Sequence, residues 1–364
     1  MRLKKTFVVF SGYNDRANIA FYRAAVKLDV SFHIVALTRQ DKVFLTDYVG
    51  NVFFVRETSE PTLSLFERVI DRFREVSDVS EKFILPNSEY LNWFLLQNRI
   101  QLQDMGWSIS LPPNDVYSLI SNKESATNWV GKFDGIEIPS NFTFNEIQFP
   151  CVAKPKLNVS SGYTQYPVFL NLESDLADFE GEDSSFFFQE FIKGKSYYFC
   201  AYVSSCGRTI SYWQENIAQQ PGGKSILLAR SCSNPGVQVT SIIDGLRELD
   251  FTGPIMMEVI LSQGEFYFIE FNPRLWGPLD LARSACPSLF ELLFEDLGFD
   301  VSFHSPEKVE THSCWYAWGF GALGHDYVVY PADDKDFSVE QVFSLICEND
   351  LYKQSDTSTL TLRF

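Results

Sequence analysis

Long apolar runs are absent from this 364-residue sequence, and its first ten residues contain only a short one, at positions 7–10. A membrane-spanning helix needs about 20 apolar residues, and the apolar part of a signal peptide needs roughly 7 to 15. We therefore predict a cytoplasmic protein without a membrane partner.

Positive charge is scarce: 30 lysine and arginine residues stand against 47 acidic ones, which gives a net charge of −17. Binding to a nucleic-acid backbone requires a positive surface that releases counterions. We therefore expect no nucleic-acid partner, and any anionic ligand must be met by a local basic pocket.

Several common site motifs are also missing. The seven cysteines include no CxxC pair, and their odd number argues against a disulfide framework. The four histidines form no HExxH motif, so we expect no zinc site. No GxGxxG follows the first apolar segment, which argues against an oxidoreductase with a Rossmann-type domain.

Strand-like and helix-like segments alternate in the amino-terminal third. Strands are expected at 6–10, 32–37, 52–55 and 83–85, and helices at 63–76, at 91–100 and from residue 15 onward. This alternation predicts a small parallel sheet, in which ligands usually bind at the carboxyl ends of the strands. The residues at such ends are Tyr13, Asn14, Arg16, Asn87 and Glu89. Tyr13 and Asn14 are candidate substrate contacts, with turn or helix-cap roles as the alternative.

Two lysines and a loop of small residues follow the proline-rich boundary at 111–114. Lys123 lies on a helix expected over 115–130, and Lys154 lies at the end of an apolar strand, where an unpaired charge is costly. Beyond it, a loop with Ser161 and Gly162 could fold its amides over a phosphate group. These segments indicate a site for an anionic ligand.

The densest pattern joins two apolar strands across the turn 262–265. Glu258 lies on the first strand, and Glu270, Asn272 and Arg274 follow at intervals of two on the second. A hairpin would bring them together, with the last three on one face. Carboxylate and amide oxygens coordinate Mg²⁺ that also binds phosphates, and a guanidinium stabilises the negative charge on a transferred phosphoryl group. The alternative is a salt-bridged polar face of a strand.

The order of these motifs resembles the ATP-grasp superfamily, of the carboxylate–amine ligase type found in the large chain of carbamoyl-phosphate synthetase, biotin carboxylase and D-alanine ligase. The resemblance covers roughly residues 1–300. The matching elements, in the family's order, are Lys123, Lys154, the small-residue loop, the Gln-Glu-Phe-Ile-x-Gly hinge at 189–194, Gly222-Gly223, Glu258 and the Glu-x-Asn-x-Arg-x-x-Gly motif that ends at Gly277.

The resemblance implies an α/β fold class, with α+β architecture in the grasp domain. Residues 1–110 would form the amino-terminal domain with a parallel sheet, and residues 111–185 a small lid subdomain with its preceding helical linker. Residues 186–300 would form the large subdomain with the metal site, and 301–364 a carboxyl-terminal extension packed on the grasp domain.

The resemblance also implies residue roles. Lys123 and Lys154 would bind ATP phosphates beneath the loop with Ser161 and Gly162. The residues implied to line the adenine pocket are Gln189, Glu190 and Ile192, and the implied ligands of Mg²⁺, or alternatively Mn²⁺, are Glu258, Glu270 and Asn272. Arg274 would face the γ-phosphoryl group.

Two parts of the family pattern are altered or open. Many members carry a glutamate after the hinge glycine that contacts the ribose, whereas this chain has Ser196 there. Arg230 and Lys224 follow Gly222-Gly223, where basic side chains could clamp a substrate carboxylate; a surface role is the alternative.

The resemblance implies a ligase that uses ATP to convert a carboxylate into an acyl phosphate, which an amine or another nucleophile captures with release of ADP and phosphate. Its partners would be small molecules, and a homodimer is one option for its assembly. A non-catalytic ATP sensor or interaction protein on the same fold is the alternative, which the complete set of transfer residues disfavours. The aromatic run at 314–321 is a substrate wall or, preferably, a strand packed on a core.

Overall fold

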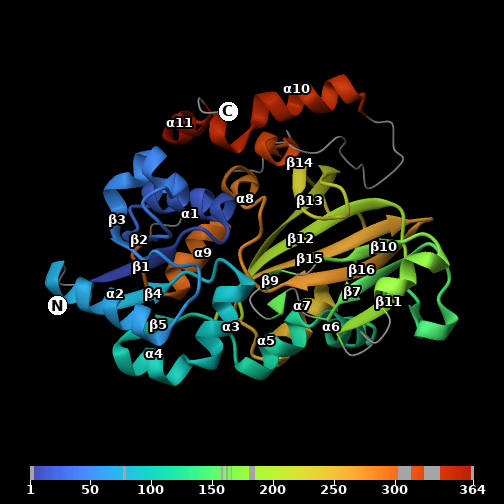
Figure 1. The fold of residues 1–364 in the computed structure, drawn as a ribbon, viewed down its shortest axis with the longest axis horizontal. Helices are drawn as coiled ribbons and strands as arrows, with labels where there is room; N and C mark the ends of the chain where they lie inside the picture. The colour runs from blue at the N-terminus through green and yellow to red at the C-terminus, as the bar shows by residue number, and fades with distance from the viewer. Residues whose placement is uncertain are drawn as a thin grey trace.

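The computed structural model describes residues 4–76, 79–156, 159–160, 163–164, 166–179, 185–301, 313–323 and 337–361. Their strands form a five-stranded, a four-stranded and a six-stranded sheet, together with a two-stranded ribbon. Figure 1 shows the five-stranded sheet and its helices in blue to teal on one side, and the longer strands of the six-stranded sheet on the other. Ser161 and Gly162 lie outside the described residues.

The amino-terminal sheet is parallel, with strand order β3-β2-β1-β4-β5. Its strands are β1 (Lys5–Phe10), β2 (Phe32–Ala36), β3 (Val52–Val55), β4 (Glu81–Ile84) and β5 (Trp107–Ile109). The helical segments of this part are α1 (Asp15–Lys27), η1 (Lys42–Leu45), η2 (Asp47–Asn51), α2 (Leu63–Val76), α3 (Glu89–Gln97) and α4 (Arg99–Met105). Because β1 is central, the chain leaves β1 and β4 in opposite directions, and a crevice forms between the loops that follow them.

Both faces of the parallel sheet are covered by apolar packing. Alternate residues of β1 point to opposite faces, so Phe7 and Val9 pack on one side and Val8 and Phe10 on the other. The first side receives α1 and also α9 (Ser288–Asp296), a helix from much later in the chain, with the rings of Phe7 and Phe294 5.6 Å apart. The sequence pattern predicted the sheet but not the return of α9 to it.

The four-stranded sheet is antiparallel, in the order β10-β7-β11-β6. Its strands are β6 (Asn141–Phe142), β7 (Cys151–Pro155), β10 (Val168–Leu170) and β11 (Phe186–Glu190), and the ribbon consists of β8 (Val159–Ser160) and β9 (Tyr163–Thr164). Short 3₁₀ helices η3 (Phe144–Glu146) and η4 (Glu173–Phe179) accompany them. Since β11 pairs with β7, this sheet extends past residue 185, and the domain ranges given above stay predictions.

The single helix expected over 115–130 is two helices, α5 (Asn114–Ser121) and α6 (Lys123–Val130). Asn122 separates them in an extended conformation, and its side-chain oxygen accepts a hydrogen bond of 3.0 Å from the Ser125 amide. Asparagine is a favourable residue for such a cap. The break makes Lys123 the first residue of α6, where its own amide donates to the Lys156 carbonyl near the end of β7.

The six-stranded sheet is antiparallel, in the order β16-β15-β12-β13-β14-β17. Its strands are β12 (Lys195–Val203), β13 (Thr209–Gln219), β14 (Ile226–Cys232), β15 (Gly253–Ser262), β16 (Glu265–Asn272) and β17 (Trp315–Ala317). One face packs with α7 (Thr240–Glu248) and α6, and the other packs toward α1, α8 (Asp280–Ala285) and α9. Along β12, Tyr197 and Phe199 pack on the face with α6 and α7. Tyr198 and Cys200 pack on the face toward α1, α8 and α9.

The carboxyl-terminal segment adds an edge strand and several helices. After β17 come η5 (Gly319–Ala322), α10 (Val339–Asn349), η6 (Leu351–Lys353), η7 (Ser355–Thr357) and α11 (Ser358–Thr361). Figure 1 shows α10 and α11 in red above the rest of the molecule. The aromatic run at 314–321 thus contains a strand whose Tyr316 and Ala317 are buried, as preferred from the sequence.

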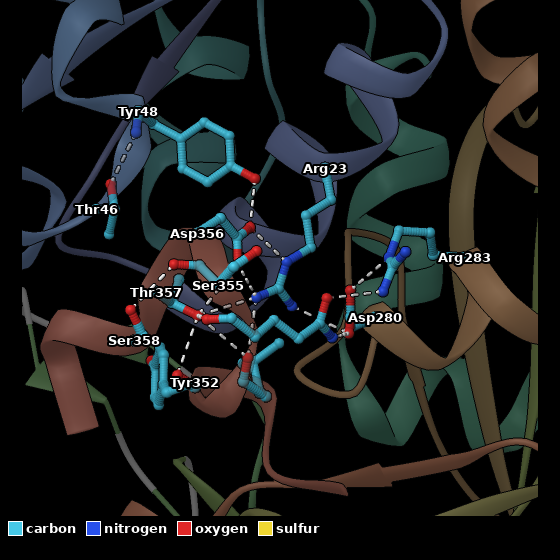
Figure 2. A network of polar contacts seen from close by, with 12 residues as sticks. Arg23, Thr46, Tyr48, Asp280, Arg283, Tyr352, Ser355, Asp356, Thr357 and Ser358 are labelled. Carbon is cyan, nitrogen blue, oxygen red and sulfur yellow. Dashed lines mark hydrogen bonds and ion pairs between the residues drawn. The ribbon is translucent and has the colours of Figure 1, made fainter.

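A buried polar network joins this segment to the amino-terminal domain (Figure 2). Arg23 of α1 pairs with Asp280 of α8 at 3.1 Å and with Asp356 of η7 at 2.7 Å. The Tyr48 hydroxyl donates a 2.5 Å hydrogen bond to Asp356, and Arg283 pairs with Asp280 at 3.0 Å. Segments more than 300 residues apart in the chain are therefore held together by one guanidinium. Within the described ranges, no helix is both long enough and apolar enough to cross a membrane.

Candidate active site

A cavity of about 900 Å³ lies where the carboxyl edge of the parallel sheet, the four-stranded sheet and the six-stranded sheet meet. Residues from all three sheets and their connecting loops line it. Those important for its chemistry are Tyr13, Asn14, Arg16, Asn87, Glu89, Lys123, Lys154, Glu190, Ile192, Ser196, Lys224, Glu258, Glu270, Asn272, Arg274 and Gly277. The cavity therefore gathers most of the residues proposed from the sequence.

The hairpin of β15 and β16 places two carboxylates opposite each other. Glu258 and Glu270 are directly paired in the strand register. Gln263 and Gly264 form the turn with φ angles of 52° and 93°, the left-handed pair that a two-residue hairpin favours. A register shift follows Glu258, so Ile269 is the extra residue of a bulge. Its carbonyl accepts a 3.2 Å hydrogen bond from the Lys154 ammonium.

Asn272 and Arg274 continue from Glu270 toward the end of the strand. The Asn272 amide donates to Glu270 Oε1 at 2.7 Å, and its oxygen accepts from Arg274 Nη2 at 2.8 Å. Arg274 lies two residues beyond β16, and its Nη1 also donates to the Leu275 carbonyl at 3.1 Å. The spacing of two therefore places these side chains on one wall of the cavity, as the sequence predicted.

Two buried lysines face these acids. Lys123 is 3% exposed and forms an ion pair with Glu270, and Lys154 is 6% exposed. Burial, with the neighbouring charge of Lys123, lowers the pKa of Lys154 to about 8. Lysines on α6 and β7 thus reach the same carboxylates from separate elements.

The two carboxylates differ in proton affinity. Burial, and next the charge of Glu270, raises the pKa of Glu258 to about 7. Burial also acts to raise the pKa of Glu270, but the charge and hydrogen bond of Lys123 outweigh it and hold that pKa below the usual range. Glu270 is therefore the more acidic of the two, and Glu258 keeps its proton to a higher pH than an ordinary carboxyl group does.

The donor set fits a hard divalent cation. Two carboxylates and one amide oxygen are ligands that Mg²⁺ takes in proteins, where water and phosphate oxygens complete the coordination. Among the described residues, no cluster of three or more His, Cys, Asp or Glu side chains suits a metal that prefers an all-protein cage.

Ser196, the residue considered for a ribose contact, lines the cavity and is hydrogen-bonded to one of the two carboxylates. Its hydroxyl donates to Glu258 Oε1 at 2.9 Å and accepts from Asn216 at 2.8 Å, and Asn216 accepts from Gln214 at 2.7 Å. This chain of hydrogen bonds orients Glu258. Sequence reasoning missed Gln214 and Asn216, although two amides spaced by two in the otherwise apolar strand β13 were a usable signal.

The three residues that the resemblance implies for an adenine pocket do not all face the cavity. Glu190 and Ile192 line the cavity, and the Glu190 carboxylate accepts a 3.0 Å hydrogen bond from Ser140. Gln189 is buried on the other face of β11, where its amide donates to Asn141 at 2.9 Å. Alternation along a strand requires that neighbouring residues point apart.

Of the four candidate substrate residues, Tyr13, Asn14 and Lys224 line the cavity. The Tyr13 hydroxyl donates to the Ser59 carbonyl at 2.5 Å, and burial raises its pKa to about 12. The Asn14 side chain caps α1 and donates to the carbonyls of Asn87 and Leu275, both at 3.1 Å. Its polar atoms are thus used in holding the loops together.

Arg230 is not brought to the cavity. It pairs at 2.7 Å with Glu215, whose neighbour in register is Tyr197, on the face of the six-stranded sheet that packs with α7. The position of Arg230 after Gly222-Gly223 suggested that it lies near the cavity. Side chains alternate between the two faces along β14, and that of Arg230 lies on the face away from the cavity.

No protein-family model and no curated protein matches the sequence. Solved structures do match the fold. An L-amino acid ligase from Bacillus licheniformis has a TM-score of 0.60 at 14% identity, over 87% of this chain and 80% of that chain. A biotin carboxylase from Campylobacter jejuni, in a complex with β-γ-ATP, has a TM-score of 0.60 at 14% identity, over 82% and 72%. An N5-carboxyaminoimidazole ribonucleotide synthetase from Thermus thermophilus has a TM-score of 0.56 at 15% identity, over 81% and 79%.

The chain therefore has the ATP-grasp fold, preceded by an amino-terminal α/β domain. The fold that the resemblance implied is confirmed, and the similarity at this level of identity concerns the fold alone.

Proposed function

We propose that this protein is an ATP-dependent ligase, which activates a carboxylate as an acyl phosphate and joins it to an amine or another nucleophile. The observation that carries the proposal is the convergence in one cavity of two lysines, two carboxylates, an amide and an arginine. Phosphoryl transfer requires positioning and charge neutralisation more than covalent assistance, and this set supplies both.

Each residue has a defined part in the proposed reaction. Lys123 and Lys154 bind the phosphates of ATP, and Glu258, Glu270 and Asn272 hold a divalent cation. When bound, that cation neutralises charge on the phosphates. Arg274 faces the phosphoryl group as it passes to the substrate carboxylate, and Ser196 keeps Glu258 oriented toward the cavity.

The test is ADP formation with a panel of carboxylates and amines, in the wild type and in Glu270→Gln and Arg274→Ala. We expect each variant to lower carboxylate-dependent turnover by about 100-fold or more, the effect of removing one electrostatic contact to a transition state. Arg247→Gln is the control, because Arg247 lies in an exposed ion pair on α7.

Thermal unfolding and circular dichroism would check that the variants fold. Turnover retained in both Glu270→Gln and Arg274→Ala would contradict the proposed mechanism. A wild-type protein that binds an ATP analogue but never releases ADP with any carboxylate would be a nucleotide sensor instead.

A further inference from the structure

Arg16 is a cationic group of the cavity that the proposed reaction has not used. It is the second residue of α1, is partly buried and lines the cavity. Its Nη1 donates to the Ile226 carbonyl at 3.4 Å, and its Nη2 to the Ser225 hydroxyl at 3.1 Å. The centre of its guanidinium lies 4.1 Å from the centre of the Trp318 ring. Two separate parts of the chain, at Ser225-Ile226 and at Trp318, thus fix one cation.

The hydrogen bonds of Arg16 to Ser225 and Ile226 are to neutral groups, and its charge also acts on the neighbouring Asp15 and on Tyr316. Arg23 and Arg230 both form ion pairs with carboxylates at 2.7 Å, but in the described part of this acidic chain no carboxylate forms an ion pair with Arg16. A guanidinium has five N–H donors, and its contacts to Ser225 and Ile226 use two. A partly buried cation with donors to spare is matched best by a planar anion that accepts two hydrogen bonds.

Gly277 provides the space for this guanidinium. A Cβ atom on Gly277 would lie 2.6 Å from Nη2 and 2.8 Å from Cζ of Arg16. The backbone of Gly277 does not have the left-handed conformation that would itself favour glycine. The glycine that ends the Glu-x-Asn-x-Arg-x-x-Gly motif is therefore explained by the position of Arg16.

The loop that carries Arg16 is tied to the segment that carries Arg274. The side-chain amide of Asn14, two residues before Arg16, and Nη1 of Arg274 each donate to the Leu275 carbonyl at 3.1 Å. An anion held by Arg16 would thus lie in the same cavity as the phosphoryl-transfer residues.

We propose that Arg16 binds the carboxylate of the acid substrate, so that this site takes a small organic acid; this inference rests on the proposed function. Trp318 and Gly277 are positioning residues, because they act by fixing the guanidinium and by leaving it room. The carboxyl-terminal segment then contributes to substrate binding through Arg16.

The test is calorimetric titration of L-alanine, L-alanyl-L-alanine, gluconate and bicarbonate, in the presence of Mg²⁺ and a non-hydrolysable ATP analogue. For the probe that binds the wild type most tightly, Arg16→Gln should weaken binding about 10- to 100-fold, the factor for hydrogen bonds between charged groups. Arg16→Lys should weaken it less. Affinity for the ATP analogue should be unchanged in both variants, and Arg247→Gln is the matched control.

Gly277→Ala provides the independent check, since its Cβ meets only the movable end of the Arg16 side chain at close range. It should weaken carboxylate binding in the wild type and have no further effect in an Arg16→Ala background, because coupled residues are not additive. The proposal would be overturned if Arg16→Gln left the carboxylate affinity unchanged, or if Gly277→Ala had an equal effect in both backgrounds. It would also be overturned if none of the four probes bound to the wild type.

Turnover separates this proposal from the function on which it rests. An unchanged KM for the carboxylate in Arg16→Gln, with normal ADP formation, would reject only the role of Arg16. Tight carboxylate and nucleotide binding without any ADP formation would reject only the ligase function.

Discussion

Glu258 and Glu270 illustrate at the residue scale how environment separates two identical side chains. They face each other across one hairpin, yet Lys123 keeps the pKa of Glu270 below the usual range while burial raises that of Glu258 to about 7. The ligand-free protein therefore holds one carboxyl group that loses its proton only at a higher pH than is usual for glutamate.

We expect this group to make the metal-free protein less stable as the pH rises. The folded-state pKa of Glu258, about 7, exceeds its ordinary value of 4.5, so its contribution is fully present below 4.5 and is lost as the pH rises through 7. Urea unfolding in EDTA between pH 5 and pH 7.5 should show the wild type losing stability relative to Glu258→Gln. Parallel pH profiles for the two proteins would contradict the raised pKa.

The positions of side chains were predictable where the spacing along one strand fixed them, and unpredictable where the pairing between strands fixed them. The interval of two placed Glu270 and Asn272 on one face, and the structure agrees. The partners of Arg230 and Ser196 depend on which strand pairs with the strand that carries each residue. No local feature of the sequence indicates that pairing. Their side chains therefore meet Glu215 and Glu258, which sequence reasoning did not pair with them.

At the scale of elements, the hinge between β11 and β12 depends on a close approach of two backbones. A Cβ atom on Gly194 would lie 2.0 Å from the Leu261 carbonyl oxygen of β15. This glycine, at the end of the Gln-Glu-Phe-Ile-x-Gly hinge, is therefore required because no side chain fits beside the neighbouring strand.

We expect Gly194→Ala to lower the free energy of unfolding by about 3 kcal/mol, the upper range for overpacking, because a backbone atom cannot move aside. Gly50→Ala is the matched control: a Cβ there meets nothing within 4 Å, and the change should cost less than about 0.5 kcal/mol. Denaturant unfolding of both variants measures the difference. Equal stabilities would show that β12 and β15 can separate at this point.

The elements of the amino-terminal sheet were predictable because their apolar periodicity is local. The break at Asn122 was not, because an uninterrupted helix over 115–130 fits the same periodicity. What favours two helices is a tertiary contact, the hydrogen bond from the Lys123 amide to the Lys156 carbonyl.

At the scale of the whole molecule, Arg23 joins the first helix to the last turns of the chain. It is buried and bonds to Asp280, Asp356, Thr357 and the Leu351 carbonyl (Figure 2). The carboxyl-terminal segment also carries Trp318, which contacts Arg16, so this network supports the cavity from a distance.

Asp356→Asn should destabilise the protein by about 2 kcal/mol, since it weakens hydrogen bonds to a buried guanidinium that keeps Asp280 as a second partner. Asp244→Asn is the control, because the pair of Asp244 and Arg247 is exposed and contributes less than about 1 kcal/mol. Chemical unfolding of both variants measures these losses. A similar small effect in both would show that the carboxyl-terminal contacts are dispensable for stability.

The same pair should respond to acid. Burial acts to raise the pKa of Asp356, but hydrogen bonds from Arg23 and Tyr48 outweigh it and hold the pKa below the usual 3.8. Its contribution is therefore present above pH 3.8 and is lost as the pH falls through the lower folded-state value. The stability advantage over Asp356→Asn should shrink in the same range.

The ion pair of Lys123 and Glu270 has a consequence for how ligands enter the site. In the proposed reaction Lys123 contacts phosphate and Glu270 contacts the cation, so both must give up their mutual contact. A ligand that took only one of them would strand the other as a buried, uncompensated charge. The nucleotide phosphate therefore replaces Glu270 as the partner of Lys123, while the cation replaces Lys123 as the partner of Glu270. Each ligand should increase the affinity for the other by the same factor.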